Sequence, residues 1–400
     1  MRIAIIADWF AEKMGYAENC LPKAIAALGH EVHLITSNVQ PYFNSKNYRE
    51  TYESFIGPGI VACESRELDG YTLHRLPHSQ YRRILRIRGL RQKLLELCPQ
   101  IVQTFDVTSL TTLEAAMLKS SAGYKLFLES HVHASVFPPA LGRGSLRDRI
   151  FWPLYANTFG KYVNMLTNKC YPISADAAET VIRFFGIKAD KVEIVPLGVD
   201  TNLFSPPSSE FLQRTRQQIR KSFGFAPNEV VCIYTGRFSK DKNPLCLAHA
   251  IDKLITDGGA FRALFVGNGP SGDVEAIRCT PGCVVQPFVP SSELPPYYWA
   301  ADIGVWPKQE STSQLDAAAC GLPLILSNRI KVLERVDGSG LLYEENDQDD
   351  LARQILRLSS AETRQMLGEQ GMQNVRRHFS WTHIAQQRLK DYEAALQARS

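Results

Sequence analysis

The 400-residue sequence lacks long hydrophobic runs, closely spaced cysteine pairs and tracts dominated by one residue type. No run approaches the roughly 18 consecutive apolar residues of a membrane span, and the N-terminal ten residues contain no small-residue cleavage site. The nine cysteines include no CxxC pair and have no histidine at zinc-ligand spacing, which excludes a disulfide scaffold and a zinc module. A composition with 44% hydrophobic and 22% charged residues excludes disorder. We therefore expect a globular, cytoplasmic protein with reduced and mostly buried thiols.

The net charge of +4 is small, and it lies in one half of the chain. Residues 1–200 hold 23 Lys and Arg against 19 Asp and Glu, whereas residues 201–400 hold 22 of each. This asymmetry indicates an acidic partner for the first half.

Short apolar runs alternate with helical patterns along the chain, which is typical of βαβ units and parallel sheets. Residues 2–7 and 31–36 predict strands. The helix between them is expected to begin near Asn19, because Pro22 is tolerated in a first turn. The second half repeats the scheme, with strand-like runs at 229–236, 262–267, 283–288, 303–306 and 323–327. A break in the pattern places a hinge near residues 195–210.

Ligands of parallel sheets bind beyond the carboxyl ends of the strands, so the loops there are the candidate sites. The turn after the 229–236 strand contains Arg237 and Lys242, followed by Asn243-Pro244 as a cap and first-turn proline. Two fixed cations can hold a diphosphate by charge-assisted hydrogen bonds. A solvated basic loop is the alternative. The first βα turn lacks the GxGxxG spacing, which disfavours a dinucleotide oxidoreductase.

The segment 306–323 carries a second candidate site. A loop of hydroxyl residues leads into a small-residue helix expected from near Ser313 to Gly321. Glu310 lies just before that helix and Asp316 about one turn inside it, and such a carboxylate pair suits sugar hydroxyls. In the alternative interpretation, a serine of this loop merely caps the helix and Glu310 complements its dipole.

Several motifs in a fixed order resemble the GT-B glycosyltransferases of family 4. They are the glycine loop Gly15-Tyr16-Ala17-Glu18, GRF…K at 236–242, VGNGP at 266–270, PFVPSSELPPYYWAADIGVWP at 287–307 and DAAACGLP at 316–323. The stretch 173–204 is similar to the family's interdomain passage, and FSW at 379–381 resembles the start of its closing helix. The set spans nearly the whole chain and is far more specific than any single motif.

The resemblance implies two Rossmann-like domains that face each other across a cleft. Residues 1–200 would form the acceptor-side domain, completed by a returning helix at 381–400, and residues 201–380 the nucleotide-sugar domain. It implies transfer of a sugar from a nucleotide-sugar donor with retained anomeric configuration, without a metal ion or other cofactor. The acceptor would be a glycan, a lipid-linked molecule or a small molecule.

The resemblance also assigns roles to individual residues. Arg237 and Lys242 match the cations that bind the donor diphosphate, and Asp316 takes the place of the second acid of the family's E-x7-E pattern, which holds the ribose. The backbone at Gly15 approaches the donor, and His131 in LESHVH matches the histidine that contacts the transferred sugar. The hydroxyl residues expected to complete the donor site are Ser311, Thr312 and Ser313.

The acid pattern departs from the family. The position of the first acid holds Lys308, and the nearest acid is Glu310, to which we assign the sugar-facing role by proximity. This departure indicates either a branch with its own donor geometry or a protein that has lost catalysis. The alternatives are a non-catalytic nucleotide-sugar-binding or assembly subunit, and a GT-B epimerase or phosphorylase.

The stretch 81–95 holds six cations and no acid. Interleaved with Ile and Leu, it is a candidate contact for an anionic membrane, such as the inner face of the plasma membrane, or for an acidic acceptor. A basic-faced surface helix is the alternative. No nucleic-acid recognition motif accompanies it, so we expect no nucleic-acid partner. The cations assigned to this contact are Arg82, Arg83, Arg86 and Arg88.

Three further patterns have a structural alternative. His131 and His133 form an HxH pair that suits a metal, but strand-end histidines are an equal interpretation without a third ligand nearby. Asp347-Gln348-Asp349 precedes a helical pattern, where acids favour a helix N-terminus, so we expect no metal there. The turn between Cys279 and Cys283 is expected to be structural.

Overall fold

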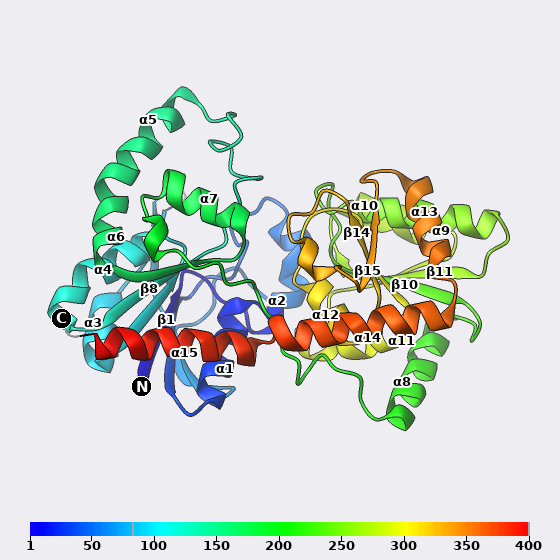
Figure 1. Ribbon diagram of the computed structural model, residues 1–400, viewed down its shortest axis with the longest axis horizontal. Helices are drawn as coiled ribbons and strands as arrows, with labels where there is room; N and C mark the ends of the chain where they lie inside the picture. The colour runs from blue at the N-terminus through cyan, green and yellow to red at the C-terminus, as the bar shows by residue number, and fades with distance from the viewer. Residues whose placement is uncertain (82–83, 399–400) are drawn as a thin grey trace.

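The computed structural model describes residues 1–81 and 84–398, and its main strands form two sheets (Figure 1). The first sheet has the order β3 (Glu64–Leu68), β4 (Tyr71–Leu76), β2 (Glu31–Ser37), β1 (Arg2–Ala7), β7 (Ile101–Phe105), β8 (Lys125–Ser130) and β9 (Thr167–Pro172). Only β3 runs antiparallel to its neighbour. The second sheet is parallel throughout, with the order β12 (Cys283–Gln286), β11 (Phe261–Asn268), β10 (Val230–Arg237), β13 (Ile303–Trp306), β14 (Leu324–Ser327) and β15 (Gly340–Tyr343).

These strands form where the sequence carries continuous apolar runs, because helices cover both faces of a parallel sheet. In β1, residues Ile3 to Ile6 are fully buried, and Val231 to Ile233 are equally buried in β10. All seven strands expected in these two halves are confirmed, with ends shifted by at most two residues. The expected α/β class with two parallel sheets is therefore confirmed.

Helices of the first half pack around the first sheet. They are α1 (Ala17–Ala27), α2 (Ser54–Ile56), α3 (Leu90–Leu97), α4 (Leu110–Ala122), α5 (Leu146–Tyr155), α6 (Lys161–Leu166) and α7 (Ala175–Phe184). The expected start of α1 is wrong by two residues. Tyr16 is the N-cap, and Asn19 closes a capping box by accepting from the Tyr16 backbone N–H at 3.0 Å. Pro22 therefore lies beyond the first turn.

Helices of the second half surround the second sheet, and the last helix leaves it. They are α8 (Ser209–Ser222), α9 (Pro244–Thr256), α10 (Ser271–Arg278), α11 (Pro295–Ala300), α12 (Ser313–Ala319), α13 (Gln348–Arg357), α14 (Ala361–His378) and α15 (Trp381–Gln397). Ile384 and Tyr392 of α15 are buried with Ile3 and Ile5 of β1, so α15 crosses back to the first sheet as expected (Figure 1). Among the described helices, none is long and apolar enough to traverse a bilayer.

The chain passes between the two halves twice, and the two passages pair with each other. The Val199 N–H donates to the Phe379 carbonyl at 2.8 Å, and the Trp381 N–H donates to the Val199 carbonyl at 3.1 Å. A Cβ at Gly198 would lie 2.8 Å from Ile384 Cδ1 and 2.9 Å from the Phe379 carbonyl oxygen. A glycine is required there because the two passages approach so closely.

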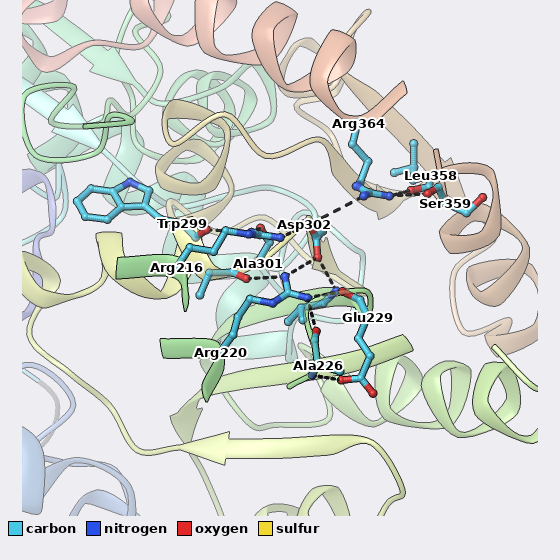
Figure 2. Close-up of polar contacts among 12 residues, drawn as sticks. Arg216, Arg220, Ala226, Glu229, Trp299, Ala301, Asp302, Leu358, Ser359 and Arg364 are labelled. Atoms are coloured by element: carbon cyan, nitrogen blue, oxygen red, sulfur yellow. Dashed lines mark hydrogen bonds and ion pairs between the residues drawn. The ribbon is translucent and has the colours of Figure 1, made fainter. Parts of the chain in front are cut away.

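A buried charge cluster joins α8 and α14 to the amino end of β13 (Figure 2). Asp302 accepts from Arg216 at 2.6 Å and from Arg220 at 3.1 Å, and its Oδ2 also accepts from the Val231 backbone N–H at 2.8 Å. Arg364 of α14 lies 4.0 Å away. Because three elements meet on one largely buried carboxylate, Asp302 fixes the helices against the edge opposite the strands' carboxyl ends.

Candidate active site

Arg237 is the last residue of β10, at the carboxyl end of the second sheet. Its guanidinium lies over the ring of Tyr42 from the first half, 5.5 Å from the ring centroid, and 3.7 Å from a carboxylate oxygen of Asp241. A cation placed this way keeps N–H donors for a ligand, since no short hydrogen bond to a carboxylate occupies them.

Lys242 lies in the turn that leads into α9. Its Nζ donates to the backbone carbonyl of Glu310 at 2.5 Å. Burial, together with the positive charge of Arg237, lowers the pKa of Lys242 to about 8. Pro244 is the first residue of α9, as predicted, whereas the Asn243 side chain does not cap the helix and donates instead to Asn346 at 3.0 Å.

The hydroxyl loop before α12 lies next to these two cations. Thr312 is the N-cap of α12 without a side-chain capping bond, so the alternative in which a serine caps this helix is wrong. The hydroxyls of Ser311 and Ser313 lie 2.7 Å apart, and Ser313 also donates to the Thr235 carbonyl at 3.2 Å. Burial raises the pKa of Asp316 to about 8, so its carboxyl group is largely protonated at neutral pH.

The first half contributes a glycine turn and several aromatic rings. Gly15 has a φ of +65°, and a Cβ there would lie 2.3 Å from the Ser291 hydroxyl of the second half. Tyr42 and Tyr52 stack with ring centroids 4.7 Å apart, and Phe55 lies 5.3 Å from the ring of Phe288. The two halves therefore meet here through backbone and aromatic surface.

These groups surround one cavity of about 220 Å³ between the two sheets. It brings together seven of the predicted site residues: Gly15, Arg237, Lys242, Ser311, Thr312, Ser313 and Asp316. A neighbouring cavity of about 300 Å³ shares three of them and reaches Val199 at the interdomain passage. The cavity therefore combines cations, hydroxyls and a protonated carboxyl group, which suits a ligand that carries both phosphate and hydroxyl groups.

Glu310 is not among the residues lining this cavity. Its carboxylate accepts from the backbone N–H of Lys331 at 2.6 Å, while its carbonyl holds Lys242. Lys308, at the position of the family's first acid, lies 4.0 Å from Glu345. The sugar-facing role of Glu310 remains a prediction.

His131 follows β8 and belongs to a buried charge network. Its Nε2 lies 2.7 Å from the Glu129 carboxylate, whose other oxygen accepts from Arg388 of α15 at 2.9 Å. Glu129 and Arg388 are almost fully buried. Burial alone would lower the pKa of His131, but the hydrogen bond and charge of Glu129 outweigh it and raise the pKa. With Nε2 held by Glu129, Nδ1 is the nitrogen left for a ligand.

Two family models match successive parts of the chain. The model described as "Glycosyltransferase Family 4" matches residues 21–203, and the model described as "Glycosyl transferases group 1" matches residues 229–361. Together they account for most of the chain, one on each sheet. The chain is a GT-B glycosyltransferase of the family 4-like type.

Curated relatives and solved structures agree with this family. The glycosyltransferase is 27% identical over 241 residues to spore coat protein SA of Bacillus subtilis (strain 168), covering 55% of this chain and 63% of that protein. It is 25% identical over 400 residues to the putative glycosyltransferase YtcC of the same organism, covering 93% and 90%. The fold matches sucrose-phosphate synthase from Thermosynechococcus elongatus, with a TM-score of 0.71, 19% identity and full coverage of both chains. It also matches Anabaena Alr3699/HepE in complex with UDP, with a TM-score of 0.68, 15% identity and 98% and 100% coverage.

Two acidic residues at the carboxyl edge of the first sheet, which line neither cavity, and the aromatic residues of the donor cavity were missed from the sequence. Glu129 lies two residues before His131, a spacing that puts both on one face of an extended strand and could have been noticed. Asp8 follows β1 and accepts from Thr111 at 2.5 Å, and burial raises its pKa to about 7. The aromatic residues Tyr42, Tyr52 and Phe55, which line the cavity, lie in a long connection without hydrophobic periodicity, so no sequence pattern indicated them.

The remaining patterns have structural roles in the glycosyltransferase. His133 lies 3.2 Å from the Asp176 carboxylate, and the described residues contain no group of three or more His, Cys, Asp or Glu side chains able to hold a metal ion. Asp347 caps α13, as predicted for the acidic triplet. The nine cysteines are all free, and five are buried.

The basic stretch does not form the single helix considered above. It contains the hairpin strand β6 (Ile84–Ile87), which pairs with β5 (His78–Tyr81), and then α3. The alternative of one basic-faced helix holds only for the part of the stretch in α3, because Gly89, with a φ of +80°, separates that helix from the strand β6. Arg86 lies 3.4 Å from Glu114, and neither Arg86 nor Arg88 lines the cavity. Arg82 and Arg83 lie outside the described residues. The assigned contact remains a prediction.

Proposed function

We propose that this glycosyltransferase binds a nucleoside diphosphate sugar in the cavity between its sheets and transfers the sugar with retention of anomeric configuration. The main support is the convergence of Arg237, Lys242, Asp316 and the Gly15 turn on one cavity. The diphosphate leaving group gains negative charge as the glycosidic bond breaks, and preorganised cations stabilise that charge. The two side-chain cations would hold the diphosphate without a divalent ion.

The same cavity suggests roles for the other polar groups. A protonated Asp316 can donate one hydrogen bond and accept others, which suits a pair of vicinal ribose hydroxyls. His131 lines neither of the two cavities, and its Nε2 is held by Glu129, so its Nδ1 is left to contact the transferred sugar or the acceptor. The acceptor, a glycan, a lipid-linked molecule or a small molecule, would bind against the first sheet. Nine free thiols favour a cytoplasmic setting.

A thermal-shift assay tests the donor site. The ligands are UDP, GDP, ADP and TDP and their nucleotide sugars, and EDTA is present throughout. A ligand that binds only the folded state raises its apparent stability. We expect one nucleotide to raise the melting temperature in EDTA, with UDP tested first because the HepE structures contain UDP or UDP-glucose. A shift that vanishes in EDTA would contradict the metal-independent site.

Single substitutions then test the two cations. Arg237→Ala and Lys242→Ala should each weaken nucleoside diphosphate binding by about 1–3 kcal/mol, measured by calorimetry. Lys240→Ala is the matched control, because Lys240 lies in the same turn but is exposed and does not line the cavity. Unchanged binding in both cavity variants would refute the diphosphate assignment.

A second candidate is a non-catalytic nucleotide-sugar-binding or assembly subunit. It is favoured by Lys308 at the position of the family's first acid and by Glu310, whose carboxylate does not line the cavity. Donor hydrolysis and transfer assays separate the two proposals, because the subunit would bind the donor without turnover. For an active enzyme, Glu310→Ala should lower turnover more than donor binding, and wild-type activity would remove Glu310 from the site. Product anomers assigned by NMR test retention.

A further inference from the structure

Exposed apolar side chains are concentrated in one thirty-residue segment of the first half. Among the described residues, 24 large apolar side chains are exposed, and nine of these lie between positions 136 and 165. We call these nine the α5 surface: Val136, Leu141, Leu146, Ile150, Phe151, Leu154, Phe159, Tyr162 and Met165. Large apolar side chains that are exposed together in one segment point to an interaction site.

Helix α5 presents much of this surface away from the protein core. None of its ten residues is buried, and Figure 1 shows it projecting beyond the first sheet. Leu146, Ile150 and Leu154, at four-residue spacing on one stripe, are 75%, 64% and 61% exposed. Trp152 lies on the opposite side and packs 5.0 Å from the ring of Phe137 and 5.4 Å from Phe185. The aromatic anchor therefore fixes which side of α5 faces outward.

Positive charge accompanies the α5 surface. Residues 136–165 contain four cations, Arg143, Arg147, Arg149 and Lys161, and one acid, Asp148. Asp148 is already engaged as part of the capping box at Ser145. Within residues 1–81 and 84–398, none of the four cations has a carboxylate within 4 Å. An apolar stripe with unpaired flanking cations matches the chemistry of a bilayer with anionic headgroups.

We propose that the α5 surface docks on an anionic lipid bilayer, with its apolar stripe in the interfacial layer and its cations at the headgroups. A second copy of the chain fits less well, because a two-fold contact through this surface would bring the four cations toward their own copies. Nucleic acid is also excluded by the apolar stripe, since exposed Leu and Ile side chains have no partner on a phosphate backbone.

The position of α5 gives this docking a consequence for the site. The chain runs from β8 through His131 directly into the loop that leads to α5. Docking would therefore hold the carboxyl end of β8 near the lipid surface. This consequence rests on the proposed function, and it favours acceptors that carry a lipid anchor over free sugars.

Vesicle flotation of the full chain tests the proposal, without donor or acceptor present. We expect binding to vesicles of phosphatidylcholine mixed with phosphatidylglycerol, and at least tenfold weaker binding to phosphatidylcholine alone, since each cation near an anionic surface contributes about fivefold. The double variant L146E/L154E should reduce binding at least about tenfold. R147Q/R149Q should reduce binding only to the anionic vesicles. The matched control F211E/M366E places two charges at similarly exposed apolar positions of the second half and should leave binding unchanged.

The outcomes separate the proposal from its competitors. Absence of wild-type binding to both vesicle types would overturn it, as would an equal loss of binding in the control variant. Light scattering that shows a dimer abolished by L146E/L154E, with vesicle binding unaffected, would assign the surface to a second copy instead. UDP binding and circular dichroism check that L146E/L154E is folded. Vesicle binding by a protein that binds no nucleotide would overturn the proposed function and leave this proposal intact.

Discussion

In the part of the chain that the structure describes, each sheet has a largely buried carboxylate that is held by arginine, and the two carboxylates lie at opposite ends of the strands. Asp302 lies at the amino end of β13 and is held by Arg216 and Arg220, which belong to α8. Glu129 lies near the carboxyl end of β8, where it is held by Arg388 and also orients His131. Because ligands bind beyond the carboxyl ends, the same ion-pair chemistry is structural at one edge and directed at the site at the other.

Removing the structural carboxylate should have the largest effect on stability. Asp302→Ala leaves Arg220 buried without its charge partner, and we expect the free energy of unfolding to fall by about 3–5 kcal/mol in a urea titration. The UDP affinity of the folded fraction and the pKa of His131 should not change, because Asp302 lies away from the cavity. A changed UDP affinity would show that the amino edge of the second sheet also influences the ligand site.

Neutralising the other carboxylate should change the site as well as the stability. Glu129→Gln keeps the shape and a hydrogen bond but leaves the buried Arg388 without its charge partner, so we expect the free energy of unfolding to fall by about 3 kcal/mol. It also removes the negative charge beside Nε2, so the pKa of His131 should fall, as followed by NMR of the imidazole proton. In the wild type this raised pKa stabilises the folded state at low pH, and that contribution is lost as the pH rises through it. A histidine titration that does not change would refute the orienting role of Glu129.

The pH dependence of UDP binding tests the two titrating groups at the cavity, Lys242 and Asp316. The pKa values of Lys242 and Asp316 are both about 8, one lowered and the other raised by burial. Above that pH Lys242 loses its positive charge and Asp316 gains a negative one, so UDP affinity should fall about tenfold per pH unit or more. Calorimetry between pH 7 and pH 9 measures this. Lys242→Arg should flatten the profile, since arginine keeps its charge. Equal profiles for the two proteins would show that Lys242 does not bind the diphosphate.

The smallest effect is expected at the aromatic contact across the cavity. Tyr42→Leu removes the ring beneath the Arg237 guanidinium, and we expect UDP binding to weaken by about 0.5–1 kcal/mol. Tyr81→Leu is the control, since this exposed tyrosine of the same half does not line the cavity. Identical UDP affinities for Tyr42→Leu and Tyr81→Leu would show that the Tyr42 ring does not contribute to donor binding.

The fold and much of the site were accessible from the sequence because both depend on local patterns. Continuous apolar runs placed the strands, and loops after strands placed Arg237, Lys242 and Asp316. The direction of a side chain could not be predicted from the sequence. Glu310 is close in sequence to Ser311 and Thr312, which line the cavity, yet its carboxylate accepts from the Lys331 backbone N–H instead. Contacts between distant segments were also inaccessible, because no periodicity connects Tyr42 to Arg237 or Arg388 to Glu129.

The two chain segments that connect the sheets are hydrogen-bonded to each other at Val199 and Phe379, so together they form a single hinge. Gly198 and Val199 line the second cavity, which shares Gly15 and Asp316 with the candidate donor cavity. A rotation of one half about these paired passages would keep the backbone hydrogen bonds that join them. Arg237 and Tyr42 belong to different halves and both line the donor cavity, so such a rotation would change the width of that cavity.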